Sequence, residues 1–363
     1  MQIGTSGLTF GNGTLAQVVS DASMVRRQLD ALTRQAGDGL ISDNLAGLGV
    51  GAAASLSLGS SLDEVKTWQT NAQAAAGPMQ TAQSALAGIS DIASHFFAET
   101  AALNGVSATA IDATAASARD ALTQMADLLN SKFGDRYVFA GTDSANPPIP
   151  GNILSSGMVT GIAATVGALA TSGAAGTIAA TLAVAMSNVP GISPFSLSLS
   201  QPAAALQSAR TMVATGSGAP TPTGMLAGTN GDVVSTGATT TGSYIRDVMR
   251  ALATIGALSG TQATAPGLGA LVQDIHTSLG DAISALNGDA GVMGNRQAAL
   301  GARQQSLGDL AAVVQGQIAN VQDVDMAATL SRLTATQTQL QASYNLLGTL
   351  RSMSLASVLA GGG

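Results

Sequence analysis

The sequence predicts a mainly α-helical protein: a long antiparallel helical bundle or coiled-coil rod built from both ends of the chain, with a central mixed α/β insertion. Two observations predict it. Apolar residues recur at alternating spacings of three and four in both terminal parts of the chain, the pattern of amphipathic helices that pack along a narrow seam. Between residues 141 and 243 this spacing fades, and glycine, proline and short β-branched runs take its place. A helix with one narrow seam is marginally stable alone, so each seam is expected to pack against another helix or another subunit.

The first helix is expected to end at residues 37–39, where a glycine can adopt the left-handed conformation that closes a helix. Its charged residues, among them Arg26 and Asp30, fall outside the apolar seam. The seam consists of Leu15, Val18, Ala22, Val25, Leu29, Leu32 and Ala36.

A helical hairpin is expected next. The seam resumes over residues 65–96, and a third seam covers residues 111–129, with an Asn-Gly turn at residues 104–105 between them. Pro78 lies inside the longer helix and is expected to kink it, because proline has no N–H to donate and crowds the preceding turn.

Helical sequence returns at Tyr244, pauses near Pro266 and continues to residue 324. The pattern slips in phase at Asp323 and Asp325, which are expected at the start of the last helix, where carboxylates accept hydrogen bonds from exposed N–H groups. A cation site formed by these two acids is the alternative. The last seam holds Leu333, Leu340, Tyr344 and Leu347, flanked by Leu350, Leu355 and Leu359.

The insertion, residues 141–243, is expected to mix short helices and strands. Alanine-rich runs at residues 160–171 and 177–187 favour helices, and β-branched runs at residues 211–215 and 232–236 favour strands.

One apolar run inside the insertion has the length of a membrane span. Residues 158–186 carry no charge, but they consist largely of Gly, Ala, Ser and Thr and are interrupted by Gly173 and Gly176. The free energy of transferring such residues into lipid is small, so no membrane insertion is expected.

Residues 133–150, FGDRYVFAGTDSANPPIP, concentrate aromatic side chains where a long helix stops. Phe133, Tyr137 and Phe139 are predicted to form a structural cluster that fills the end of the bundle with the bulk that alanine seams lack. The prolines at residues 147–148 then prevent a helix or strand from continuing and begin the insertion.

The composition excludes several classes of protein. Charged residues make up 10% of the chain, with a net charge of −7 and only two lysines, so a nucleic-acid partner is not expected. The absence of cysteine excludes disulfides, zinc thiolate sites and cysteine nucleophiles. Residues 1–14 lack a continuous apolar segment, so no cleavable signal peptide is expected; the chain is either cytoplasmic or exported by a route that reads an uncleaved polar start.

No catalytic residue, cofactor site or metal site is predicted. Residues 47–52 match G-x-G-x-x-A, but no strand precedes them and no acid follows at the required distance, so a glycine-rich loop is expected. The histidines are His95 and His276. His95, with Glu99 four residues on, has a spacing that could orient a metal ligand, but a structural role is favoured because no second histidine or cysteine lies near it in the sequence.

Residues 37–56, GDGLISDNLAGLGVGAAASL, resemble the loop after the first helix in the flagellin superfamily, which comprises filament flagellins and hook–filament junction proteins. Leu40 stands where the family usually has an arginine, and Asn44 replaces its second acid. The matching residues are Ser42, Asp43, Ala46 and Gly47.

Two later segments carry the same resemblance. Residues 135–142, DRYVFAGT, followed by the prolines at 147–148, are similar to the strand and exit turn of the junction protein, and residues 320–359 resemble the family's C-terminal helix. The resemblance covers about residues 1–150 and 240–363 and implies a rod. The implied domains are terminal helices that form an inner tube (1–43 with 324–363), a helical rod (44–140 with 244–323) and a variable, outward-facing insertion (141–243).

The resemblance implies a structural component of the bacterial flagellum that self-assembles through its terminal helices. It implies an extracellular protein, exported unfolded by the flagellar type III route, whose partners are other copies, other flagellar subunits and an export chaperone. The predicted subunit-interface residues are Leu15, Val18, Val25, Leu29, Leu32, Leu333, Leu340, Tyr344, Leu347 and Leu355.

Within the family, three features favour the hook–filament junction protein: DRYVFAGT, the segment QTQLQAS at residues 337–343, and Leu40 in place of the usual arginine. A filament flagellin stays open as the alternative. The tail at residues 360–363 is atypical of both. A secreted adhesin or effector that acts through the uncharged residues 144–209 is a more remote alternative, and an enzyme is a third.

Overall fold

The computed structural model describes residues 10–103, 105 and 107–360. The chain divides into two compact units, Met1–Val65 with Asp309–Gly363, and Lys66–Gly308. Each unit is described by itself.

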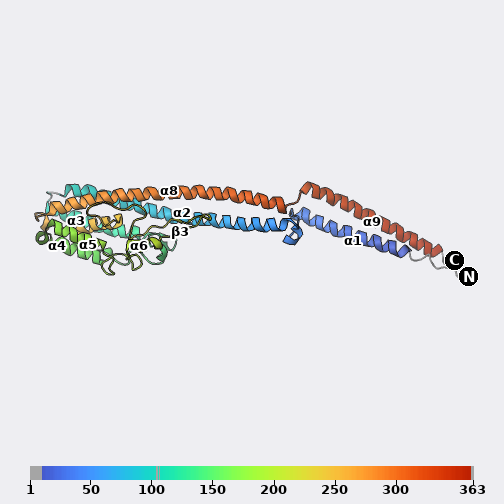
Figure 1. Cartoon of the computed structure of the whole chain (residues 1–363), viewed down its shortest axis with the longest axis horizontal. Helices are drawn as coiled ribbons and strands as arrows, with labels where there is room; N and C mark the ends of the chain where they lie inside the picture. Colours follow the sequence, from blue (N-terminus) through green and yellow to red (C-terminus); the bar gives the residue numbers. More distant parts are fainter. Residues whose placement is uncertain (1–9, 104, 106, 361–363) are drawn as a thin grey trace. The chain divides into compact units, whose positions relative to one another are not determined.

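In the first unit, helix α1 (Phe10–Asp38) and helix α9 (Met326–Ala360) lie side by side (Figure 1). A short 3-10 helix η1 (Leu45–Leu48) follows α1 and leads into α2 (Gly51–Ala102). The other long helix, α8 (Leu268–Gln322), ends shortly before α9 begins. The expectation of long helices at both ends of the chain is confirmed.

The second unit contains the rest of α2 and α8, together with α3 (Ala108–Leu129) and α7 (Tyr244–Gly256). Its two antiparallel hairpins are minimal: β1 (Lys132–Phe133) pairs with β2 (Arg136–Tyr137), and β3 (Met212–Val213) pairs with β4 (Thr221–Pro222). The remaining elements are α4 (Gly157–Gly167), α5 (Leu169–Met186), α6 (Ala203–Leu206), and the 3-10 helices η2 (Gly141–Asp143), η3 (Ile153–Ser155), η4 (Gln207–Ala209) and η5 (Gly260–Gln262).

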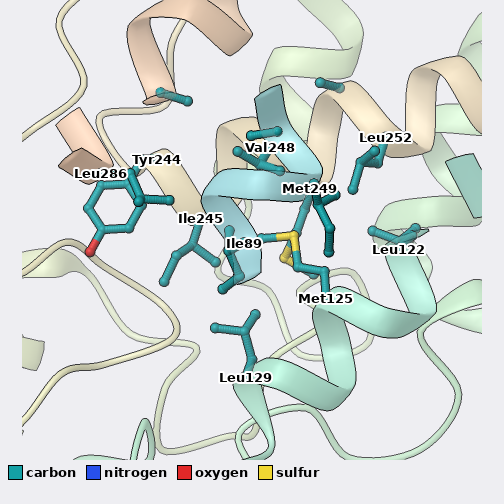
Figure 2. Packing of buried hydrophobic residues seen from close by; sticks show 14 of the residues in the cluster. Ile89, Leu122, Met125, Leu129, Tyr244, Ile245, Val248, Met249, Leu252 and Leu286 are labelled. Atoms are coloured by element: carbon teal, nitrogen blue, oxygen red, sulfur yellow. The ribbon is translucent and has the colours of Figure 1, made fainter. Parts of the chain in front are cut away.

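The core of the second unit is centred on α7, in which every residue is buried. Side chains of α3, including Met125 and Leu129, meet Ile245 and Met249 of α7 (Figure 2). The seam positions of α2 and α3 are rich in alanine, whose small side chain lets helices approach closely. Larger side chains from α2, α3, α7 and α8 fill the core between them. Burying one such large aliphatic side chain stabilises the fold by about 1.5–3 kcal/mol.

Residues 141–243 share this core and do not have one of their own. Met158, Ile162 and Val166 of α4 are fully buried in the same cluster as α3 and α7, and Leu206 joins them. Helices α4 and α5 match the two short helices predicted here, and β3 lies inside the predicted strand at residues 211–215.

The predicted strand at residues 232–236 is absent, and this expectation was wrong. The N–H groups of Asp232 and Val233 donate to the side chain of Asp289 on α8, so these groups are satisfied without a partner strand. A β-branched run therefore forms irregular structure when a side chain supplies the acceptors.

Helix ends follow the predicted signals. Gly39 has φ 73° directly after α1, and its N–H donates to the carbonyl of Gln35 at 2.9 Å. At the start of α9, the Asp325 carboxylate accepts from the Ala328 N–H at 3.0 Å, which is the helix-start role expected for this acid. Helix α2 continues through Pro78.

Among the described residues, α5 is the one helix long and apolar enough to cross a membrane by length and composition. Gly173 inside it has φ 69° and ψ 170°, so α5 is two shorter helical pieces joined at a break. These pieces pack on α4 and α7.

Candidate assembly interface

The α1–α9 pair carries the seam residues that were predicted to form subunit contacts. Leu32 is buried between the helices, and the other described seam leucines and valines are partly covered. Within one copy, each helix of such a pair can bury only one face. The partly buried seam residues are Val18, Val25, Leu29, Leu333, Leu340 and Leu347; Tyr344 is 49% exposed, and the side chains of Leu15 and Leu355 lie outside the described ones.

Apolar side chains also point away from this seam. Val19 and Met24 on α1 are about half exposed, at 52% and 50%, and so are Leu330 and Leu346 on α9, at 48% and 53%. Single exposed apolar residues are ordinary on a protein surface, but here both members of a two-helix pair carry them. The pair therefore has unburied apolar surface that contacts with other chains can cover.

The loop after α1 is tied to the start of α9 by backbone hydrogen bonds. The Val324 N–H donates to the Gly39 carbonyl at 2.9 Å, and the Ile41 N–H donates to the Gln322 carbonyl at 2.7 Å. These bonds flank a bridge between Leu40 and Asp323. Leu40, which stands where the resembled family usually has an arginine, thus lies opposite Asp323 in this bridge, with the hydrogen bonds made by its two neighbours.

The glycine-rich run at residues 47–52 extends from the end of η1 through a turn into the first two residues of α2. Asn44 caps η1 by accepting from the Gly47 N–H at 3.0 Å, and Ser42 Oγ accepts from the Asn44 N–H at 3.3 Å. The Ser42 side chain lies directly against Gly47, where a Cβ atom would collide with it. In the described part of this segment a 3-10 helix precedes the run, whereas a nucleotide-binding turn would follow a strand.

The three aromatic residues predicted to cluster do not share one environment. Phe139 is fully buried in the core, whereas Phe133 is 49% exposed and lies across Gly77 of α2. Tyr137 is partly buried, with the Lys132 ammonium 4.5 Å from its ring centre. Phe133 sits in a hairpin strand with its side chain turned to the α2 surface, so only Phe139 fills the end of the bundle. Phe133 and Tyr137 instead line a cleft of about 520 Å³.

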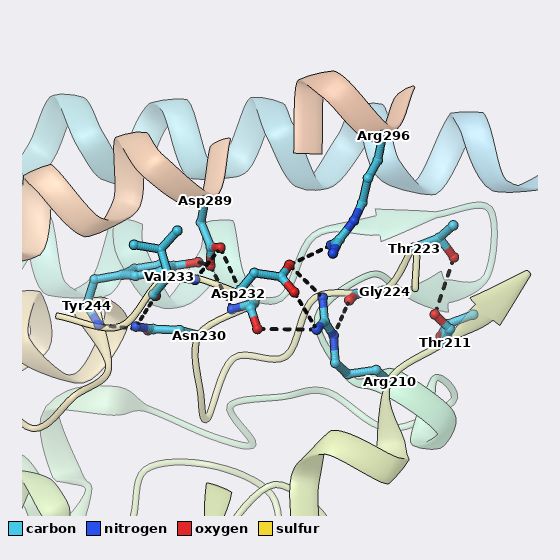
Figure 3. Close-up of polar contacts among 11 residues, drawn as sticks. Arg210, Thr211, Thr223, Gly224, Asn230, Asp232, Val233, Tyr244, Asp289 and Arg296 are labelled. Carbon is cyan, nitrogen blue, oxygen red and sulfur yellow. Dashed lines mark hydrogen bonds and ion pairs between the residues drawn. The ribbon is translucent and has the colours of Figure 1, made fainter. Parts of the chain in front are cut away.

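A polar cluster lies where α8 faces the segment before α7 (Figure 3). The buried Asp289 carboxylate accepts from three successive N–H groups, those of Gly231 at 2.7 Å, Asp232 at 2.7 Å and Val233 at 2.9 Å, and from the Tyr244 hydroxyl at 3.0 Å. Burial, together with the Asp289 charge, raises the pKa of Tyr244 well above its usual value.

Asp232 lies between two arginines (Figure 3). Its carboxylate is 2.6 Å from Arg296 Nη1 and 3.4 Å from Arg210 Nη2. The hydrogen bond from Arg296, supported by Arg210, holds the pKa of Asp232 below its usual range. Arg210 also donates to the backbone carbonyls of Gly224 and Gly231, so one guanidinium fixes three parts of the segment.

Helix α7 carries three buried charged residues. Arg250 pairs with Asp274 at 3.0 Å, and Arg246 donates to the carbonyls of Ala185 and Gly228 at 2.9 and 3.0 Å. Burial lowers the pKa of Arg246 to about 10 and raises that of Asp247. These groups bind backbone and side chains within the fold, an arrangement that holds the insertion on α7.

The histidines make structural contacts. His276 Nδ1 lies 3.0 Å from Thr100 Oγ1 and 3.1 Å from the Phe97 carbonyl, and its ring stacks on Phe97 at 4.0 Å. The His95 ring meets Phe96 edge-on. Within the described residues no three His, Asp or Glu side chains gather in a way that could hold a metal ion.

The sequence of the α8–α9 region shows which known proteins this chain resembles. Residues 277–359 match the family model of the bacterial flagellin C-terminal helical region. The chain carries a flagellin C-terminal region. The predicted resemblance to the flagellin superfamily is confirmed for this part of the chain, which spans most of α8 and nearly all of α9.

The fold is also that of a solved structure assigned as a flagellar hook-associated protein from Vibrio parahaemolyticus. The two share 11% sequence identity, with a TM-score of 0.50 over 77% of this chain and 99% of the other. At this identity the likeness shows the fold, and it agrees with the predicted mainly α-helical rod with a small mixed insertion. A comparison with curated proteins finds no match.

The flagellin C-terminal region contains both the predicted interface residues of α9 and contacts that sequence reasoning missed. Asp289, Arg296 and Arg303 lie in it and bind residues of the insertion. The sequence did carry a signal for these contacts. Charged residues are only 10% of the chain, yet these three recur at intervals of seven residues, which places them on one face of a helix.

Proposed function

We propose that the chain is a structural subunit of the bacterial flagellum that assembles through α1 and α9. The observation that carries this proposal is that the flagellin C-terminal region forms half of a two-helix pair whose outward faces still expose apolar side chains. Two paired helices leave part of their apolar surface exposed to water. Packing against neighbouring copies would bury this remaining apolar surface. The proposed location is the extracellular flagellum, reached by export of the unfolded chain with a chaperone.

Within the flagellum, the proposed role is that of the hook–filament junction protein. Support comes from residues 135–142 and 337–343, which resemble the junction protein, and from Leu40 in place of the usual arginine. The fold shared with the Vibrio protein is consistent with this role. A filament flagellin is the second candidate, since the flagellin C-terminal region is compatible with both.

Assembly is tested first by removing residues 324–363. The truncated chain should remain soluble and partly helical by circular dichroism but should not polymerise, as measured by light scattering and electron microscopy. A truncated chain that still polymerises would refute the proposal.

Point variants separate contacts within a copy from contacts between copies. Val19→Ser changes a 52% exposed residue of α1, and Val234→Ser is its matched control, because Val234 is 60% exposed outside the terminal helices. Both should keep wild-type helicity, and only Val19→Ser should slow polymerisation. Equal effects of the two variants would contradict an interface on α1.

The junction role is tested by counting copies. Purified flagella should show the protein as a minor gel band, and a labelled antibody should mark only the hook end of each filament. A dominant band and labelling along the whole filament would instead establish the filament flagellin.

A further inference from the structure

Residues 223–243 connect β4 to α7 without regular secondary structure, and residues 225–231 within them are buried. Met225, Leu226 and Ala227 are at most 4% exposed, and Asn230 is 4% exposed. Buried backbone N–H and C=O groups need partners, and a segment without a helix or a sheet cannot supply them from its own ladder. The partners must come from elsewhere in the fold.

Helix α8 supplies three of them through Asp289, which belongs to a row of charged side chains on one side of the helix. The single Asp289 carboxylate accepts hydrogen bonds from three successive N–H groups of the segment. Its approach depends on Gly231, where a Cβ atom would lie 2.8 Å from Asp289 Oδ2.

The other members of the row act on the same stretch of chain. Arg296 binds the Asp232 carboxylate at 2.6 Å, and Arg303 donates from Nε to the Thr215 carbonyl at 2.9 Å. Asp281 lies directly against Gly237. Asp274 pairs with Arg250, which in turn donates to the Thr239 carbonyl at 2.9 Å. The polar row of α8 is Asp274, Asp281, Asp289, Arg296 and Arg303, at intervals of seven, eight, seven and seven residues.

Seven residues are about two turns of an α-helix, so these side chains lie on one face. Their partners run the opposite way along the chain: Asp274 reaches Thr239 through Arg250, Asp281 meets Gly237, Asp289 binds residues 231–233, and Arg303 binds Thr215. The segment thus runs antiparallel to α8 and is held at successive points.

We propose that the polar row of α8 is a docking template for residues 211–243, with Asp289 as the positioning residue. The template sets the register of this irregular segment and lets it detach and re-dock as a local unit while α3, α7 and α8 stay packed. The inference concerns contacts within one chain and does not depend on the proposed flagellar role.

Such a local opening requires that the apolar core stay packed when the segment detaches. The side chains of α7 that meet α3 are apolar and fully buried, including Val248 and Leu252, and no side chain of the row belongs to their hydrophobic cluster. Loss of the contacts that Asp289 and Arg296 make to residues 231–233 therefore leaves this packing in place. Local opening with a free energy below that of global unfolding is the expected behaviour.

The scarcity of basic residues makes the opening measurable by trypsin. Between Arg136 and Arg296 the cleavage sites are Arg210, Arg246 and Arg250, which are only 7%, 5% and 1% exposed. Arg210 lies at the edge of the docked segment, whereas the other two lie in α7. Cleavage at Arg210 alone reports undocking, and cleavage in α7 reports unfolding of the core.

The test uses the full chain with Asp289→Asn, and Asp309→Asn as the control, because Asp309 is an exposed acid on the same helix outside the row. Asp289→Asn should speed tryptic cleavage at Arg210, and amide hydrogen exchange in residues 228–243, by at least about tenfold, since a charged acceptor of several bonds is lost. Exchange in α3 and α7 should stay at the wild-type level, and the control should match wild type throughout.

Arg296→Gln is a second variant, at the row position after Asp289, in case Asp289→Asn does not fold. It should speed exchange of residues 228–243 without changing helix content, to a smaller degree than Asp289→Asn. Unchanged exchange of residues 228–243 in a folded variant would overturn the proposal, and so would exchange that rises equally in α3 and α7.

Discussion

Arg250 and Asp274 form an ion pair at 3.0 Å with side chains only 1% and 7% exposed. Removing one partner leaves the other charge buried and unpaired, so Asp274→Asn should lower the free energy of unfolding by about 3–5 kcal/mol. Urea unfolding followed by circular dichroism measures this. The double variant Arg250→Met with Asp274→Leu, which leaves no buried charge at the pair, should recover much of the loss; a double variant as unstable as the single one would contradict this account.

Alanine substitutions at Gly141 and Gly134 can distinguish the cost of backbone strain from the cost of a steric collision. Both have φ 62°, but a Cβ atom at Gly141 would collide with the Ala209 carbonyl, whereas nothing lies within 4 Å of one at Gly134. Gly134→Ala should cost about 1 kcal/mol from the left-handed conformation alone, and Gly141→Ala clearly more. Thermal unfolding of the two variants side by side gives the comparison, and equal losses would show that the fold relaxes around Ala209.

Phe139 and Phe133 should respond differently to truncation. Phe139→Ala empties a fully buried site and should lower the free energy of unfolding by about 3–5 kcal/mol. Phe133→Ala removes a side chain that is 49% exposed and should cost less than half of that. Similar costs in urea unfolding would mean that the two rings stabilise the end of the bundle together.

Ionisation of Asp232 and of Asp247 should change the free energy of unfolding with pH in opposite directions. The pKa of Asp232 lies below its ordinary 3.8, so its stabilisation is complete above pH 3.8 and is lost as the pH falls through the lower folded value. The pKa of Asp247 lies above 3.8, so its contribution is complete below pH 3.8 and is lost as the pH rises through the folded value.

Urea unfolding from about pH 3 to pH 7 tests both signs. As the pH rises over this range, Asp232→Asn should become progressively less stable than wild type, and Asp247→Asn should gain relative to wild type. Parallel stability curves for a variant and wild type would show that the replaced carboxylate has the same pKa in the folded and unfolded chain.

The long helices were predictable because each has a local pattern. Alternating spacings of three and four, Gly39 and the acids at residues 323–325 fixed α1, α9 and their ends to within a few residues. The relation to flagellins was accessible for a similar reason, since the family match covers the contiguous residues 277–359.

The docked segment was not predictable in the same way. Val233 and Val234 favour a strand by composition, but the acceptor for the Val233 N–H is Asp289, which lies 56 residues away in the sequence. Phe133 was assigned to the core by type, whereas its place in a two-residue hairpin strand leaves it 49% exposed. In both cases tertiary contacts outweigh local preference.

The polar row also constrains the length of α8. One residue inserted between Asp274 and Arg303 would rotate everything after it by about 100° about the helix axis, so that the later side chains would face away from their partners. Related chains should therefore vary in length freely in the exposed loops of residues 141–210 but not within this part of α8. An alignment of such chains should show substitutions there without gaps.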